Sequence, residues 1–197
     1  MKLVIATRNK DKIIEIKEIF EGNSFELISL SEFPQAPEVE ETGKNLLENA
    51  LLKAESAAKT TGLPAIADDT GLFVDALNGE PGVRSSRYAG ENVSYEENRK
   101  LLLKNLDNAH GADRRARFET IAVLVDESGH ITAKGEVEGL ITNEERGNNG
   151  FGYDPIFQSV YSEKTFGELT RTEKKAFSHR GKAFQELLRI MNTKYSS

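Results

Sequence analysis

Two adjacent aspartates, Asp68 and Asp69, follow the short apolar run 65–67. The run predicts a buried strand, and ligand sites in open α/β sheets collect where strands end. Neighbouring carboxylates repel each other unless a cation neutralises them, and Mg²⁺ binds such oxygen ligands while keeping waters that can do chemistry. The pair therefore favours a Mg²⁺ site, although Thr70 and Gly71 also fit an exposed acidic turn.

A polar turn, residues 7–12, lies where an apolar N-terminal strand gives way to a helical pattern. A helix N-terminus offers unpaired N–H groups and a partial positive charge, so it binds anions readily. Thr7 and Asn9 add hydrogen-bond donors, and Lys12 adds a full charge. The turn therefore predicts a phosphate site. This site would not be a P-loop, because the GxxxxGK[ST] motif does not occur in the sequence. An ordinary capped helix with a solvated lysine is the alternative.

Two glutamates and a lysine could join these groups. Glu40 and Glu41 precede a predicted helix, and either could share a metal ion with the two aspartates. Acidic residues at this position also favour a helix N-terminus simply by their charge. Lys53 follows Glu41 by twelve residues and could face the same site if the loop and the helix border it.

Two later motifs fit a planar base. The loop Phe151-Gly152-Tyr153-Asp154 can stack a base and bind its edge, although a tight turn with Phe151 in the core is equally compatible. The run Ser178-His179-Arg180, with Lys174 nearby, offers donors to a carbonyl edge such as the O6 of a purine. A catalytic serine is not favoured, because adjacent Ser178 and His179 side chains diverge and no GxSxG motif occurs.

Hydrophobic periodicity predicts the elements that carry these motifs. Strands are expected over residues 3–6, 25–30, 65–68, 117–125 and 131–137, and helices over residues 13–20, 44–61, 94–105 and 183–191. The early strands alternate with helices, whereas the last two form a hairpin. We therefore expect an α/β fold around a mixed sheet.

The composition narrows the class of protein. With 197 residues, of which 38% are hydrophobic, the chain can form one domain over residues 1–197. A net charge of −6 disfavours binding to polymeric nucleic acid. The absence of cysteine excludes disulfides and thiolate nucleophiles and fits a reducing compartment. No apolar stretch approaches the roughly 20 residues of a membrane helix, and the N-terminal run is too short for a signal peptide. We expect a cytoplasmic protein without a membrane partner.

Taken together and in order, the motifs resemble the inosine triphosphate pyrophosphatase family, which acts on non-canonical purine nucleoside triphosphates and includes dITP/XTP pyrophosphatases. The resemblance extends from the first strand to the last helix. It rests on Thr7-x-Asn9-x-x-Lys12, Glu40-Glu41-Thr42-Gly43, Ala67-Asp68-Asp69-Thr70-Gly71-Leu72, Pro81-Gly82 with Ser86-Arg87-Tyr88-Ala89-Gly90, Gly150-Phe151-Gly152-Tyr153-Asp154-Pro155 and Ser178-His179-Arg180-Gly181.

This resemblance implies both a fold and an activity. The fold would be an α/β sandwich of two lobes around an elongated mixed sheet flanked by helices, with the active site in the central cleft. The enzyme would cleave ITP, dITP and XTP between the α and β phosphates, giving the monophosphate and pyrophosphate. It would use Mg²⁺, with Mn²⁺ as the other candidate metal, and it would form a homodimer.

The resemblance also implies roles for individual residues. Asp69 would be the catalytic carboxylate that binds Mg²⁺ and orients or deprotonates the attacking water, supported by Asp68. Glu41 or Glu40 would complete the metal site, and Thr70 would touch the substrate. The triphosphate would be held by the turn Thr7, Arg8, Asn9, Lys10, Asp11 and Lys12 together with Lys53. The base would pack against Phe151, Gly152, Tyr153 and Asp154 and be read by Lys174, His179 and Arg180.

Arginine at position 180 has a chemical reason to favour inosine, because its N–H groups can donate to the 6-oxo acceptor. Adenine presents an amino donor there, and such a mismatch costs about 1–3 kcal/mol. Three other functions compete with this interpretation. One is a septum-inhibition-type pyrophosphatase that acts on modified pyrimidine nucleotides, and another is a nucleotide-binding regulator without turnover. The third is an interaction or structural module with an acidic surface, which explains the charge but none of the motifs.

Overall fold

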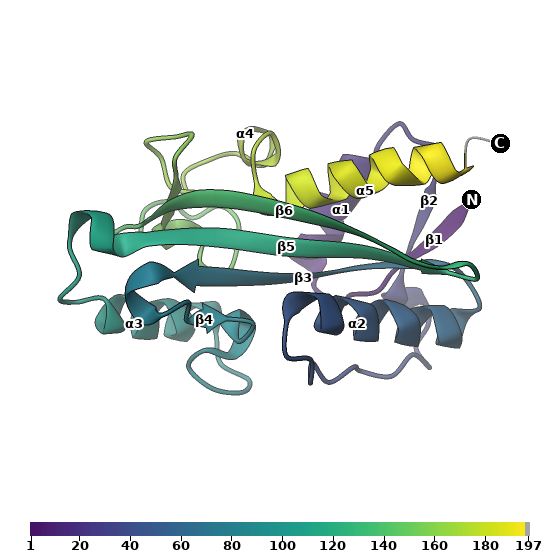
Figure 1. Cartoon of the computed structure of the whole chain (residues 1–197), viewed down its shortest axis with the longest axis horizontal. Helices are drawn as coiled ribbons and strands as arrows, with labels where there is room; N and C mark the ends of the chain where they lie inside the picture. Colours follow the sequence, from purple (N-terminus) through teal and green to yellow (C-terminus); the bar gives the residue numbers. More distant parts are fainter. Residues whose placement is uncertain (196–197) are drawn as a thin grey trace. The chain divides into compact units, whose positions relative to one another are not determined.

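The computed structural model describes residues 1–195 (Figure 1). Of Ala112 it describes the backbone but not the side chain. Its strands are β1 (Lys2–Ile5), β2 (Glu26–Ser29), β3 (Ala65–Val74), β4 (Pro81–Gly82), β5 (Arg115–Asp126), β6 (Gly129–Ile141) and β7 (Phe157–Ser159). Its α-helices are α1 (Lys10–Phe20), α2 (Leu46–Thr61), α3 (Tyr95–Asn105), α4 (Arg171–Lys175) and α5 (His179–Tyr195). None of the helices in this part of the chain is both long and apolar enough to cross a membrane.

The strands form one mixed sheet in the order β2-β1-β3-β5-β6-β7, with β4 paired to β3. β1 is parallel to both β2 and β3, whereas β4 and β7 run antiparallel to their neighbours β3 and β6. β5 and β6 are joined by a two-residue turn, which only antiparallel strands permit. The predicted α/β class with a mixed sheet is therefore confirmed.

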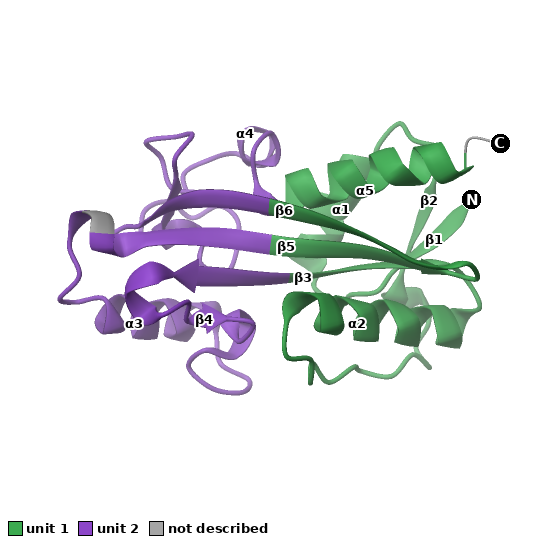
Figure 2. Cartoon of the chain, viewed as in Figure 1, with its two compact units in different colours: residues 1–69, 120–135, 180–197 green, residues 70–119, 136–179 purple. Residues whose placement is uncertain are grey.

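The chain folds into two compact units, each made of several chain segments (Figure 2). Unit 1 comprises residues 1–69, 120–135 and 180–197, and unit 2 comprises residues 70–119 and 136–179. The chain passes from one unit to the other after Asp69, Glu119, Gly135 and His179. Neither unit is therefore a continuous stretch of sequence.

In unit 1, helices cover both faces of the sheet because the buried strands are apolar on both sides. Alternate residues of a strand point to opposite faces. Leu3 and Ile66 accordingly pack with residues of α1 and α5, whereas Val4 and Ala65 pack with the alanine-rich face of α2. Figure 1 shows α2 on one side of these strands and α1 and α5 on the other. The same alternation places Asp68 and Asp69 on opposite faces of β3.

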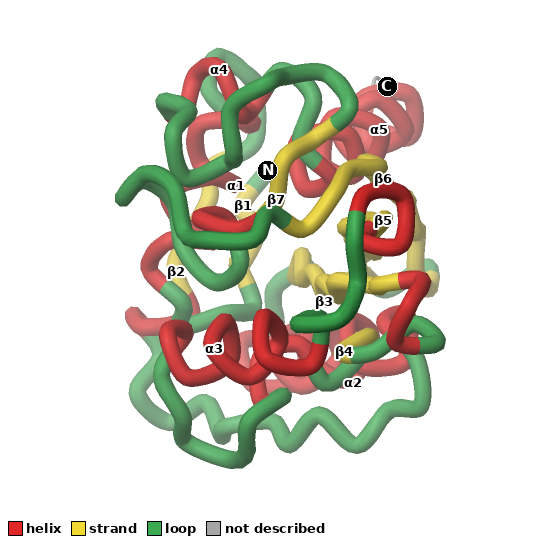
Figure 3. Tube along the Cα trace, turned by 90° about the vertical axis from the view of Figure 1, so that its left-hand side faces the viewer, coloured by secondary structure: helices red, strands yellow, loops and turns green. Residues whose placement is uncertain are grey.

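In unit 2, a separate apolar core forms around the ends of the long strands. Leu72 of β3, Leu102 of α3 and Phe118 of β5 are buried in it together with Phe157 and Phe166. Figures 1 and 3 show α3 on one side of these strands and α4 on the other. A capping box begins α3, with the Ser94 hydroxyl accepting from the N–H of Glu97 and the Glu97 carboxylate accepting from the N–H of Ser94.

The prediction that the third strand ends at Asp68 is wrong, since β3 continues to Val74. Thr70-Gly71 resembles a turn, but here Gly71 lies within the strand because β4 approaches closely. A Cβ on Gly71 would lie 2.8 Å from the carbonyl oxygen of Gly82. The N–H of Leu72 donates to the Ser85 hydroxyl at 2.8 Å, so the loop after β4 supports the extended strand. The two aspartates consequently lie inside a strand.

Other predicted boundaries shift by smaller amounts. The hairpin strands are longer than expected, and α2 begins at Leu46, where Asn45 caps it. The last helix begins at His179, so His179 and Arg180 occupy its first turn instead of the loop before it.

Candidate active site

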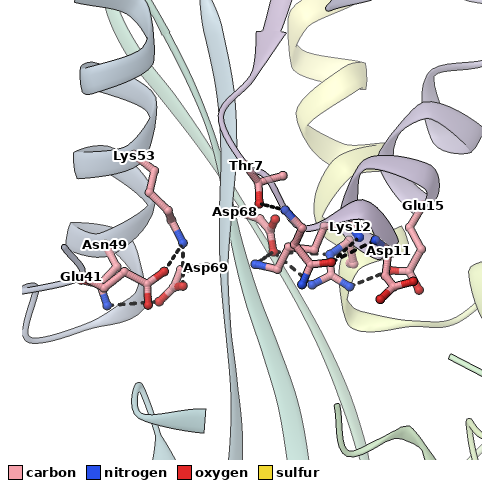
Figure 4. Close-up of polar contacts among 11 residues, drawn as sticks. Thr7, Asp11, Lys12, Glu15, Glu41, Asn49, Lys53, Asp68 and Asp69 are labelled. Atoms are coloured by element: carbon pink, nitrogen blue, oxygen red, sulfur yellow. Dashed lines mark hydrogen bonds and ion pairs between the residues drawn. The ribbon is translucent and has the colours of Figure 1, made fainter. Parts of the chain in front are cut away.

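Asp68 and Asp69 are both buried, with exposed fractions of 3% and 5%, and they point to opposite faces of β3. Asp68 shares the face of Ile66 and meets α1 and α5, whereas Asp69 shares the face of Ala67 and meets α2. Figure 4 shows the Asp69 side chain on one side of β3 and the Asp68 side chain on the other. The carboxylates therefore avoid mutual repulsion by facing apart, and each has its own cationic partners.

On the α2 side, one lysine bridges two carboxylates. The ammonium of Lys53 lies 2.8 Å from an oxygen of Glu41 and 2.8 Å from an oxygen of Asp69. Burial lowers the pKa of Lys53, but the attraction of Asp69 and Glu41 outweighs it, so the pKa is raised overall. Burial, aided by the charge of Glu41, raises the pKa of Asp69 against the opposing effect of Lys53. A single positive charge is thus shared by two acidic groups.

The side chain of Asn49 completes this group. It lies one helical turn before Lys53 on α2 and is fully buried. Its amide nitrogen donates to the second oxygen of Asp69 at 3.3 Å, and its amide oxygen accepts from the N–H of Gly43 at 2.7 Å. The loop that carries Glu41 and the strand that carries Asp69 are therefore both tied to α2.

On the opposite face, Asp68 meets two cations. Lys12 lies 3.1 Å from its Oδ2 atom, and the Arg180 guanidinium reaches the same oxygen at 3.1 Å. Arg180 also binds Glu15 at 2.6 Å. Burial raises the pKa of Asp68, but Lys12 and Arg180 outweigh it and hold the pKa well below its usual range. Burial lowers the pKa of Lys12 despite the attraction of Asp68.

The polar turn before α1 is a capped helix start. The amide oxygen of Asn9 accepts from the N–H groups of Asp11 and Lys12, and the Thr7 hydroxyl accepts from the N–H of Asn9. Arg8 donates to the carbonyl of Ala36 at 2.7 Å and so holds the loop between β2 and α2. Lys10 is exposed. Within this turn, the Lys12 side chain forms an ion pair with Asp68.

A cavity of about 120 Å³ opens beside this turn, within unit 1. Thr7 and Arg8 line it on one side, and Lys53 and Ser56 of α2 line it on the other. The structure thus brings the first residues of the predicted phosphate turn and the predicted phosphate lysine to one cavity. Glu38 also lines it, whereas Glu40 is exposed.

The predicted base-binding loop forms a second cluster, in unit 2. Lys174 is buried and pairs with Asp154 at 2.7 Å, and its ammonium lies 5.3 Å from the centre of the Phe151 ring. The N–H of Phe151 donates to the same Asp154 oxygen at 2.9 Å. Gly150 permits this turn, with φ of +71°, because a Cβ there would lie 2.0 Å from Asp154. Phe151, Asp154 and Lys174 are thus held as one group.

The remaining predicted base contacts have other partners. Tyr153 is buried, and its hydroxyl donates to the carbonyl of Ser85 at 2.9 Å. The carbonyl of Gly152 accepts from Arg99. His179 stacks on Phe118, with ring centres 4.4 Å apart and planes 20° apart. Thr70, next to Asp69, is half-buried.

Sequence reasoning missed Asn49 and Glu15. Both lie on predicted helices, one turn before Lys53 and one turn after Lys12 respectively, so helical spacing would have placed each beside a predicted site lysine. Sequence reasoning left the choice between Glu40 and Glu41 open. In the structure it is Glu41 that shares Lys53 with Asp69. Arg180, predicted beside the base, has Asp68 and Glu15 as its ion-pair partners.

The donor set on the α2 side fits a divalent cation. Glu41 and Asp69 already hold a cation, the Lys53 ammonium, between their oxygens. Within residues 1–195 no cluster of three or more acidic or histidine side chains is suited to a metal ion. Mg²⁺ commonly uses only one or two carboxylates together with substrate phosphates and water, so this pair is sufficient.

Fold and site together define an α/β protein in which two buried aspartates of a central strand are paired with half-buried lysines. The chain belongs to the Ham1 family, whose family model matches residues 3–190. A dITP/XTP pyrophosphatase of Geobacter sulfurreducens is 51% identical over 183 residues, which cover 92% of this chain and 92% of that protein. One of Elusimicrobium minutum is 50% identical over 192 residues, covering 95% and 98%.

Solved structures agree with these relatives. A Ham1 protein from Coxiella burnetii superposes with a TM-score of 0.89 at 42% identity, covering 98% of this chain and 99% of that one. The Staphylococcus aureus Ham1 protein gives a TM-score of 0.87, also at 42% identity, covering 98% and 100%. The fold and the family indicated by the sequence motifs are therefore confirmed.

Proposed function

We propose that this protein hydrolyses non-canonical purine nucleoside triphosphates, namely dITP, ITP and XTP, to the monophosphate and pyrophosphate. The observation that carries the proposal is the Lys53 ammonium, held between Glu41 and Asp69 beside a cavity that Thr7 also lines. Such a group can bind a polyphosphate and a cation together. The names of the relatives, dITP/XTP pyrophosphatases at 50–51% identity, support the same substrate class.

The triphosphate would bind beside the N-terminus of α1, where the helix dipole attracts anions. Lys12 and Lys53 approach from opposite sides of β3 and would supply the full positive charges. Thr7 would add a hydroxyl donor, and Arg8, Asn9, Lys10 and Asp11 complete the turn. Thr70, which follows Asp69, would contact the same substrate.

Asp69 would orient the water that attacks the α-phosphate and accept its proton. Burial favours this role because it raises the pKa of Asp69. Asp68 would not touch the water, since it faces the other way. It would instead hold Lys12 and Arg180 in place.

The metal would be Mg²⁺, or Mn²⁺ in its place, held by Asp69 and Glu41. When bound, it would neutralise phosphate charge during cleavage, as hydrolysis of a phosphoanhydride requires. Lys53, released from the carboxylates by the metal, would then be available to the phosphates. The exposed Glu40 is the less suitable ligand.

The base would lie on Phe151, with the Lys174–Asp154 pair at its edge. The loop Gly152-Tyr153 shapes this surface, and His179 would contribute a donor if its stacked ring faces the base. Arg180, which Asp68 and Glu15 hold in place, would donate to the 6-oxo group of the base.

The test is pyrophosphate release from ITP, XTP, dITP, GTP, ATP and dUTP, with and without Mg²⁺. Metal-dependent release strongly favouring the first three supports the proposal. Preference for a pyrimidine would instead favour the septum-inhibition type, which gains no support from the relatives above. Tight binding without pyrophosphate release would favour a regulator.

We further propose that the chain works as one domain, as a homodimer in the cytoplasm, with no polymeric nucleic acid as partner. Size-exclusion chromatography with light scattering tests the dimer directly.

A further inference from the structure

Asn49 bridges two parts of the proposed site that the sequence separates by more than twenty residues. Its amide nitrogen donates to Asp69 at 3.3 Å (Figure 4). Its amide oxygen accepts from the N–H of Gly43 at 2.7 Å. Gly43 lies two residues after Glu41. One side chain therefore connects the loop of one proposed metal ligand to the carboxylate of the other.

The chemistry of both partners requires an amide at this position. A backbone N–H can only donate, and an ionised carboxylate can only accept. The amide of Asn49 is thus oriented without ambiguity, with oxygen toward Gly43 and nitrogen toward Asp69. Aspartate would keep the acceptor but lose the donor, and a hydrophobic residue would satisfy neither group. Because Asn49 is fully buried, water cannot replace the missing partner.

The approach of the loop is unusually close. A Cβ on Gly43 would lie 2.5 Å from the Asn49 amide oxygen and 2.7 Å from the Cβ of Glu48. No side chain fits there without moving the loop. Glycine at this position therefore permits the short contact that fixes the loop against α2.

We propose that Asn49 is a positioning residue, which orients the Asp69 carboxylate and sets its spacing from Glu41. It acts through these two groups and does not itself contact substrate. The proposal rests on the proposed function, because it gives Glu41 and Asp69 their roles. Lys53 cannot serve the same purpose, since its flexible ammonium must leave the carboxylates whenever a metal binds, whereas the amide bonds can persist.

The chain offers a matched control in Asn98 of α3. It is also buried, with an exposed fraction of 2%, and it also joins a helix to a loop. Its amide oxygen accepts from the N–H of Ala89 at 2.7 Å, and its nitrogen donates to the carbonyl of Ser86 at 3.1 Å. Asn98 differs in having no carboxylate partner, so loss of its amide has the same structural cost without the proposed positioning effect.

The experiment compares Asn49→Ala, Asn49→Asp and Asn98→Ala with the wild type. Three quantities are measured: the free energy of unfolding in urea, the affinity for Mn²⁺ without nucleotide by calorimetry, and kcat and KM for ITP. Both alanine variants should lose similar stability. Only Asn49→Ala should lose about 10- to 100-fold in Mn²⁺ affinity and in kcat, as the loss of residues behind metal ligands typically does. Its KM should change little.

Asn49→Asp separates loop anchoring from carboxylate orientation, since it keeps the acceptor for Gly43. We expect kcat to fall with this variant as well. Full activity of Asn49→Asp, or equal kcat and Mn²⁺ affinity in the two alanine variants, would overturn the proposal. If the wild type binds Mn²⁺ but releases no pyrophosphate, only the proposed function is overturned. The Mn²⁺ affinities of Asn49→Ala and Asn98→Ala would then still decide the role of Asn49. A wild type that does neither would overturn both.

Discussion

Asp68 and Asp69 are neighbours in sequence, yet their carboxylates lie on opposite faces of β3. Asp68 binds Lys12 and Arg180, and Asp69 binds Lys53 and Asn49. The strand thereby turns an apparent acidic pair into two separate ionic groups with different partners. Substitution of Asp69 should therefore affect mainly catalysis, whereas substitution of Asp68 should affect mainly stability.

Asp69→Asn should lower kcat for ITP by about 100- to 10,000-fold, the usual contribution of a general base. The change is isosteric, so the fold should persist, with Lys53 keeping Glu41 as its partner. Steady-state pyrophosphate release measures the loss, and circular dichroism checks the fold. Near-normal turnover would contradict the catalytic role of Asp69.

Asp68→Asn should act first on stability. It removes a buried charge that faces Lys12 and Arg180, and breaking such a pair typically costs about 3–5 kcal/mol. Urea unfolding at neutral pH measures this cost. If the variant is as stable as the wild type but inactive, Asp68 has a direct catalytic role that its position does not explain.

Acid should destabilise the protein partly through Asp68. Its folded pKa lies well below the unfolded value of about 3.9, so below pH 4 the unfolded chain takes up a proton that folded Asp68 does not. The free energy of unfolding therefore falls as the pH falls. Asp68→Asn should flatten this dependence between pH 5 and pH 3, relative to an exposed control, Asp107→Asn. An unchanged slope would show that Asp68 titrates normally when folded.

Lys53→Met should strengthen the binding of Mn²⁺ to the nucleotide-free protein, because the ammonium no longer competes for Glu41 and Asp69. The same variant should weaken the binding of a non-hydrolysable nucleotide, which loses a positive charge. Calorimetry measures both affinities, and Lys59→Met on the exposed side of α2 serves as the control. Weaker Mn²⁺ binding by Lys53→Met would exclude competition between lysine and metal.

Arg180→Ala tests two roles at once. The sequence predicts weaker discrimination between ITP and ATP, since the arginine would read the 6-oxo group. The contacts with Asp68 and Glu15 add a loss of stability. The ratio of kcat/KM for the two nucleotides isolates the first effect and urea unfolding the second. If stability falls while the ratio stays constant, the base is read by other residues.

The sequence was most informative where interactions are local. Helical spacing located α1 and α2, although they begin at Lys10 and Leu46 and not at the predicted residues 13 and 44. The end of β3 was mispredicted because Thr70-Gly71 has the composition of a turn, whereas a strand that follows later, β4, packs against Gly71. Arg180 and Asp68 are 112 positions apart, so no local pattern could have paired them. Opposite faces for the two aspartates could have been predicted once the strand was known to continue.

The contact between Asp68 and Arg180 also has a consequence for biosynthesis. Unit 1 takes its last segment from residues 180–197, so a nascent chain on the ribosome already contains both aspartates, Lys12 and Lys53 long before Arg180 is made. Until then Asp68 lacks one of its two cationic partners, so burying its carboxylate costs more free energy than in the complete chain. Translation order thus delays completion of this buried charge network until the final helix has been synthesised.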